Sequence, residues 1–304
     1  MTTLSHFHKA LCLSGLLFAA AQAAFGYGTT YVSRLGSDSA SCGINVAPCY
    51  SLQAAYLNTD TGGTIKVLDA NAVAPLGIVI NRPVTIDGSG LAVIENIFSP
   101  GSPAILVSAN CTLRNLIIQV TSGDGIQVNT ANVHVNIENV QIEGLPAAFT
   151  NGIYVTAAGV NLSVQASSIE GAVTGLNLAG SNGIFTGTGL QIHNSSLAAI
   201  SITAGSGTLR HSLLLGSGAA GASIGLSVSG AAFLLDNCES TGNATGVLVD
   251  GGAGPAVVRI GNSVIAGNGT GLNAVNGGQL ISLRTNTIGA NLNDGTPPLG
   301  ASLK

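Results

Sequence analysis

The sequence has few charged and few aromatic residues. Of its 304 residues only 7% are charged and 4% are aromatic, tryptophan is absent, and the one methionine is the initiator. Disordered chains are rich in charge and poor in branched aliphatic residues, whereas 46% of this chain is apolar. So few large aromatic side chains predict a narrow core of stacked aliphatic layers. The 43 glycines, with Asn and Ser between β-branched residues, indicate short strands and tight turns.

Residues 1–23 have the pattern of a secretory signal peptide. Lys9 supplies the positive charge, an apolar run follows, and Ala21-Gln22-Ala23 fits the cleavage site. The run is too short for a stable membrane span, so we expect a secreted protein, extracellular or periplasmic, with no span after cleavage. An uncleaved N-terminal anchor is the less favoured alternative. Without Lys9 the chain has eight basic and thirteen acidic residues, a net charge of −5 that does not suit nucleic acid.

Four cysteines remain after the signal peptide. Cys42 and Cys49 lie close together in SCGINVAPCY, which in an exported protein favours a disulfide that closes a small loop. Cys111 and Cys238 lie apart in strand-like runs, and we interpret them as buried free thiols rather than a long-range bridge. No CxxC pair or His/Cys cluster indicates zinc, and we expect neither a metal nor a cofactor.

A short unit repeats along the chain. GNATGVLV begins at Gly242 and GNGTGLNA begins 25 residues later at Gly267. Related runs recur from Gly77 onward at steps of 21 to 27 residues, a period that is typical of a solenoid. The units lack helical periodicity, which argues against leucine-rich and helical repeats, and they are too short for propeller blades. The remaining architecture is an all-β, single-stranded parallel β-helix of about nine to ten rungs.

A second column of positions marks one turn of each rung. The residue there is small or polar in every unit: Asn115, Asn139, Ala166, Gly189, His211, Asn237, Asn262 and Thr285. Asn enters the left-handed backbone region more readily than most residues, and stacked Asn amides can bond from rung to rung. We therefore predict a structural turn ladder at Asn115, Asn139, Asn237 and Asn262.

The residues that precede these turn positions form a polar column on the expected outer surface. The column includes Arg114, Glu138, Arg210 and Asp236, so we expect Arg114 to stack on Glu138 and Arg210 to stack on Asp236. A polar groove for sugars is one interpretation. Two exposed ion pairs, worth about 0.2–1 kcal/mol each, are the favoured one.

The N-terminal segment and the repeat together resemble a known superfamily. Tyr31 to Ala70 combines YVS, GSD, PCYSLQAA and GGTIKV in the order found in many secreted bacterial β-helix proteins. The chain thus resembles the right-handed parallel β-helix proteins of the pectin lyase-like superfamily. We expect residues 24–63 to hold the disulfide loop and a capping helix over Ser51–Leu57, residues 64–290 to form the β-helix, and residues 291–304 to form a tail whose prolines end strand pairing.

The catalytic motifs that the resemblance implies for enzymes are absent. The sequence has no Asp-Asp pair, no Gly-His-Gly and no Asp-Pro-His-Glu, so the catalytic residues are unknown. We interpret His134, His193 and His211 as hydrogen-bonded turn residues. Neither a stack of carboxylates nor a fixed outward column of Thr, as ice or mineral binding would need, is evident from the repeat.

These observations favour a secreted, non-catalytic β-helix that binds a polysaccharide or a cell-surface component, or has a structural role. The alternative is a polysaccharide lyase or glycoside hydrolase that acts on an acidic polysaccharide. Five Asn-x-Ser/Thr sequons, including those at Asn243 and Asn268 in the repeated motif, are explained by turn composition without glycosylation. The sequence favours no oligomeric state over a monomer.

Overall fold

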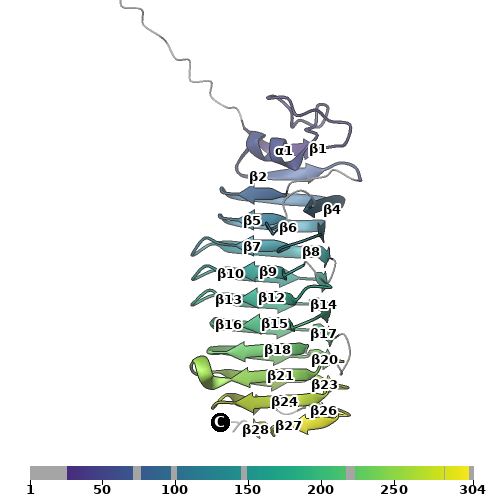
Figure 1. The fold of residues 1–304 in the computed structure, drawn as a ribbon. Coiled ribbons are helices and arrows are strands. Elements are labelled where there is room, and N and C mark those ends of the chain that lie inside the picture. The colour runs from purple at the N-terminus through teal and green to yellow at the C-terminus, as the bar shows by residue number, and fades with distance from the viewer. Residues whose placement is uncertain are drawn as a thin grey trace, which may run out of the picture.

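The chain folds into a parallel β-solenoid of about nine turns with one short α-helix at its N-terminal end (Figure 1). The computed structural model describes residues 26–70, 77–96, 101–144, 149–216, 223–283 and 285–300. The signal peptide expected at residues 1–23 lies outside the described residues. No helix in the described part of the chain is long and apolar enough to cross a membrane.

The solenoid has three faces, and most turns have a separate strand on each of them. The first face contains β1 (Tyr27–Val32), β2 (Thr59–Val67), β10 (Asn161–Gln165), β13 (Ile184–Thr188), β16 (Gly205–Arg210), β19 (Ala231–Asp236), β22 (Val257–Gly261), β25 (Gln279–Ser282) and β28 (Leu299–Gly300). The second face contains β11 (Ser168–Glu170), β14 (Gln191–Ser195), β17 (Leu213–Gly216), β20 (Glu239–Thr241), β23 (Val264–Ala266) and β26 (Thr287–Gly289). Three long strands run through both faces: β4 (Val84–Asn96), β6 (Cys111–Val120) and β8 (His134–Gly144).

The third face is a separate ten-stranded parallel sheet. It contains β3 (Ile78–Ile80), β5 (Ile105–Val107), β7 (Ile126–Val128), β9 (Asn151–Val155), β12 (Thr174–Leu178), β15 (Ala198–Ile202), β18 (Ile224–Ser229), β21 (Thr245–Asp250), β24 (Thr270–Val275) and β27 (Asn293–Gly295). A 3-10 helix, η1 (Gly251–Ala253), follows β21.

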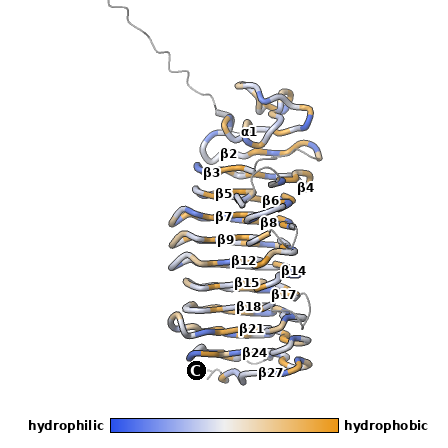
Figure 2. The backbone as a smooth tube through the Cα atoms, viewed as in Figure 1, coloured by the Kyte–Doolittle hydropathy of each residue, from blue (hydrophilic) through white to orange (hydrophobic). Residues whose placement is uncertain are grey.

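Inward side chains stack on their equivalents in neighbouring turns. Leu162 of β10, for example, pairs with Val135 of β8 and with Phe185 of β13, and all three are buried. Parallel strands lie about 4.8 Å apart, so each inward residue packs against the next layer of the same column. Figure 2 shows hydrophobic segments alternating with polar ones along each turn. The aliphatic composition therefore builds a narrow core that runs the length of the solenoid.

The bend between the first and second faces contains one left-handed residue in each of the eight turns from β6 onward. All eight positions that the sequence places in the turn column have positive φ, between 46° at Ala166 and 65° at Gly189. An L-residue with a large side chain is disfavoured in this region, which explains the preference for Asn, Gly and other small or polar residues. The period read from the sequence therefore locates this bend.

The N-terminal end is closed by a helix and a disulfide loop. Helix α1 (Leu52–Asn58) begins one residue later than expected because the side chain of Ser51 caps it, accepting a hydrogen bond from Ala54 N–H. Leu52 and Tyr56 are the large residues of this helix that are buried. Cys42 and Cys49 form the expected disulfide. Strand β1 precedes this cap and pairs with β2, so the solenoid begins before residue 64, where the sequence placed its start.

Strand pairing also continues into the C-terminal segment, where the two prolines were expected to end it. Strand β27 pairs with β24, and β28 pairs with β25. Pro297 and Pro298 lie between these two strands. Because a residue outside a strand supplies no ladder hydrogen bond, their missing N–H groups do not interrupt the pairing.

Candidate functional site

The charged column lies on the first face, but Arg114 has a different partner from the one expected. Arg114 is in register with Glu138 of the next turn, yet its guanidinium binds Asp87 of the preceding turn, with Nη2 and Nε each 3.0 Å from Oδ2. Asp87 also accepts hydrogen bonds from the Asn115 side chain and from Ser89 N–H, so its carboxylate is held in place. The Asp87 side chain is already held in place, whereas the Glu138 side chain is exposed. An ion pair with Asp87 therefore costs less side-chain entropy than an ion pair with Glu138.

The two remaining members of the charged column form the pair that the sequence suggested. Arg210 Nε lies 3.6 Å from Asp236 Oδ2, and both residues are partly exposed to solvent.

Partial burial of Asp87 opposes its ionisation, but the bonds from Asn115 and Ser89 and the charge of Arg114 outweigh it and hold the pKa of Asp87 below its ordinary value. Lys66, Asp87, Arg114 and Glu138 alternate in sign along successive strands, so this part of the surface is close to neutral.

The side chains of the turn column form two short ladders rather than one. In the first, Asn115 Nδ2 donates to Asp87 Oδ1 and Asn139 Nδ2 donates to Asn115 Oδ1, each over 2.9 Å. The second, near the C-terminal end, joins Asn262 to Asp236 over 3.0 Å and Thr285 to Asn262 over 2.6 Å. Asn237 has the same left-handed backbone, but its side chain makes no hydrogen bond to the rest of the described chain. The other turn positions between the two ladders are Ala166, Gly189 and His211.

A third ladder, made of amide side chains, runs through the core at the repeated motif and was not evident from the sequence. We call it the interior ladder. Asn243 Nδ2 lies 3.1 Å from Asn268 Oδ1, and Asn268 Nδ2 lies 3.0 Å from Asn291 Oδ1. Asn243 and Asn268 are each only 1% exposed. Their amides also bind backbone carbonyls of the turn, which satisfies groups that the core would otherwise leave unpaired. The two sequons in this motif therefore belong to the core.

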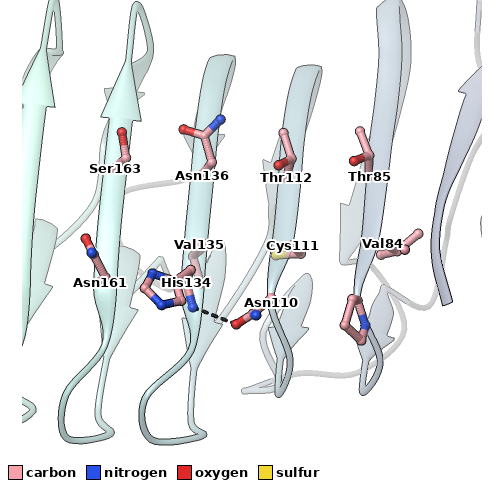
Figure 3. A pocket seen from close by; sticks show the side chains of 12 residues that line it. Val84, Thr85, Asn110, Cys111, Thr112, His134, Val135, Asn136, Asn161 and Ser163 are labelled. Carbon is pink, nitrogen blue, oxygen red and sulfur yellow. Dashed lines mark hydrogen bonds between the residues drawn. The ribbon is translucent and has the colours of Figure 1, made fainter.

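The first face carries a groove of about 500 Å³ near its N-terminal end. Figure 3 shows Thr85, Thr112, Asn136 and Ser163 side by side on neighbouring strands, with a second row of Asn110, His134 and Asn161. His134 N–H donates to Asn110 Oδ1 over 2.8 Å, which fixes the Asn110 amide. The groove thus presents hydroxyl and amide groups and one imidazole, with no carboxylate among its lining residues.

These side chains belong to a longer column of hydroxyl and amide residues. Strand register places the following residues next to one another on eight successive strands of the first face: Thr29, Thr64, Thr85, Thr112, Asn136, Ser163, Thr186 and Thr208. We call this set the hydroxyl–amide column. Its members are partly or fully exposed, and the next residue in register is Leu234. The expectation that outward Thr residues do not share a column was therefore wrong, because the turns differ in length and hide the alignment.

Carboxylates also align, contrary to expectation, on the second face. Glu95, Gln119, Glu143, Glu170 and His193 are in register on successive turns, and we call them the glutamate column. Each of the last four lies four residues after the turn position, a signal that the sequence contains. Gln119, Glu143 and Glu170 of this column line a groove of about 460 Å³ together with Asn194 and others.

Hydrogen bonds draw the two central carboxylates of this column toward opposite neighbours. Glu143 accepts from Gln119 over 2.8 Å and from Gln141 over 2.9 Å, whereas Glu170 accepts from Asn194 of the following turn over 3.3 Å. Within the described ranges, no three His, Cys, Asp or Glu side chains are grouped so that they could hold a metal ion.

Solved structures give the fold a wider context. Pectate lyase Pel9A is similar over 91% of this chain and 78% of its own, with 15% identity and a TM-score of 0.51. The mannuronan C-5 epimerase AlgE6 A-module of Azotobacter vinelandii (15% identity, 80% of this chain, 92% of that chain) and the GH136 lacto-N-biosidase from Eubacterium ramulus (9%, 90%, 67%) have TM-scores of 0.37 and 0.35. The chain has the parallel β-helix fold of pectin lyase-like proteins.

No family model matches this chain. No curated protein matches it either.

Proposed function

We propose that this protein is a secreted, non-catalytic β-helix that binds a neutral polysaccharide along the hydroxyl–amide column. The observation that carries the proposal is the register of eight hydroxyl and amide side chains on successive strands of the first face. A sugar chain laid across these strands meets a new hydrogen-bonding group at every turn, about 4.8 Å from the last. The leader pattern at residues 1–23 and the Cys42–Cys49 disulfide support export.

Charge favours a neutral ligand over a polyanion. A uronate polymer needs a surplus of Lys and Arg, but the neighbouring column of Lys66, Asp87, Arg114 and Glu138 alternates in sign. Hydroxyl and amide side chains both donate and accept hydrogen bonds, which suits the hydroxyl groups of a neutral sugar.

The proposal is tested by isothermal titration of the purified protein against neutral and uronate-containing polysaccharides. Ser163→Ala removes one hydroxyl of the column, and Ser201→Ala removes an outward hydroxyl from the third face as the matched control. One lost hydrogen bond is worth about 0.5–1.5 kcal/mol, so Ser163→Ala should weaken binding about 2- to 10-fold. Equal affinities for the two variants, or binding restricted to uronate polymers, would contradict the proposal.

A second candidate, glycoside hydrolysis, is favoured by one observation on the second face. Glu143 and Glu170 are in register on adjacent turns, and retaining glycosidases hold two carboxyl groups about 5–5.5 Å apart. Reducing-end release from each polysaccharide that binds would support this candidate. Glu143→Gln and Glu170→Gln should then each abolish release without changing binding, whereas unchanged release in both variants would exclude the pair.

A further inference from the structure

The first amide ladder ends at an unused acceptor. It starts at the Asp87 carboxylate and passes through Asn115 to Asn139, each amide donating to the residue before it. Asn139 Oδ1 is the last acceptor of this hydrogen-bonded ladder, and no described side chain or backbone group donates to it. In such a chain each bond polarises the next, so an amide that already donates becomes a better acceptor. Asn139 Oδ1 is therefore well suited to receive a hydrogen bond from outside the protein.

The two turns that follow Asn139 lack the side chains that would extend the ladder. The left-handed positions there are Ala166, with φ of 46°, and Gly189, with φ of 65°. A Cβ added at Gly189 would come no closer than 3.7 Å to the Ala166 backbone, so the position has room for a Cβ atom. The backbone N–H groups of both residues already donate to carbonyls of the next turn. These two turns therefore lack side-chain amides, although their backbone hydrogen bonds are made.

The space left by these two amides lies within a groove along the bend. The groove measures about 510 Å³, and its lining includes Asn139, Ala166, Gly189 and Gln191. Gln191 is exposed, and its side-chain amide makes no hydrogen bond to any described residue. The groove therefore offers an acceptor at one side, a free amide donor at another, and the methyl group of Ala166.

We propose that this groove binds the acetamido group of an N-acetylated sugar, which takes the place of the missing ladder amides. The inference rests on the proposed carbohydrate-binding function and names a ligand class for a second site. The acetamido N–H donates to Asn139 Oδ1, its carbonyl accepts from Gln191 Nε2, and its methyl group packs on Ala166. A carboxylate in the same place would have no proton for Asn139 Oδ1, and a lone hydroxyl would leave the Ala166 methyl uncovered.

The experiment measures binding of N,N′,N″-triacetylchitotriose and of cellotriose, which has hydroxyl groups in place of the acetamido groups. The wild-type protein should bind the acetylated trimer at least 10-fold more tightly. Ala166→Asn supplies the missing amide from the protein itself and should reduce that affinity at least 10-fold. Because Asn suits a left-handed position better than Ala, this variant should unfold at the same or a higher temperature, which separates lost binding from lost folding.

Thr285→Asn is the matched control, since it places the same side chain at a turn position outside the groove. It should bind triacetylchitotriose as the wild type does. Equal affinity for the two trimers, or unchanged affinity in Ala166→Asn, overturns the acetamido site. If neutral polysaccharides still bind and Ser163→Ala still weakens them, the proposed function stands without this site. If no glycan binds, both fail.

Discussion

Truncation of Asn268 should destabilise the protein far more than removal of an exposed ladder amide. Asn268 is 1% exposed, and its Oδ1 accepts from both the backbone N–H and the side-chain amide of Asn243 over 3.0 and 3.1 Å. Its Nδ2 lies within 3.1 Å of Ser240 O and Ala266 O. Asn268→Ala therefore leaves the buried Asn243 N–H without its acceptor and removes the side-chain donor that binds Ser240 O and Ala266 O. Each unpaired buried group costs about 1–3 kcal/mol, so we expect a loss of about 3–4 kcal/mol.

The comparison variant is Asn262→Gly on the exposed turn ladder. Glycine keeps the left-handed conformation at this position, where φ is 49°, and water can replace the lost bond to Asp236. The expected loss is below about 1.5 kcal/mol. Both variants are measured by urea unfolding followed by circular dichroism. Equal m values are required because solenoids can unfold in parts. Similar losses for Asn268→Ala and Asn262→Gly would refute the assignment of the interior ladder as a buried network.

Three further predictions concern acid stability, the disulfide and the free thiols. The folded-state pKa of Asp87 is lowered, so its contribution to stability is present above the unfolded-state pKa and is lost as pH falls through the folded-state value; Asp87→Asn should flatten the acid side of a stability-versus-pH curve, and an unchanged slope would contradict this. Replacing both Cys42 and Cys49 with Ser reopens a loop of sequence separation 7 and should cost about 2.5 kcal/mol by chain entropy in chemical unfolding, whereas no change would mean that the cap unfolds independently. Burial raises the pKa of Cys111 to about 12 and that of Cys238 to about 11, so neither thiol should react with iodoacetamide at pH 8 until urea unfolds the chain, as mass spectrometry of the native protein would check.

The repeat and its bend were predictable from the sequence because both depend on local chemistry. A left-handed residue restricts the choice of side chain, so the turn column remains visible in Asn115, Asn139 and Asn262 even where other positions vary. Alternation of apolar residues likewise reports which side chains face the core. The ends were less predictable, since β1, β27 and β28 join the solenoid by pairing with distant strands, and short runs beside prolines carry little pattern of their own.

The outer columns were harder to predict, because they depend on register across turns of unequal length. Thr85 and Thr112 are 27 residues apart, whereas Thr64 and Thr85 are 21 apart, and a fixed period misses one or the other. Counting from the turn position would have aligned Glu143 with Glu170, since each lies four residues beyond it. The ion pair between Arg114 and Asp87 could not be predicted from register alone, because Arg114 is in register with both Asp87 and Glu138. The structure shows which of the two carboxylates is held in place and binds it.

The hydroxyl–amide column also gives the first face a measured length. In the proposed binding mode a sugar chain gains one contact for each turn that it crosses, and the polar run ends where Thr208 pairs with Leu234. Affinity for a series of oligosaccharides should thus rise in steps as the oligomer lengthens and then level off once its end passes Thr208. Adding or deleting whole turns should therefore change the oligomer length at which affinity levels off, without altering the contact made at any single turn.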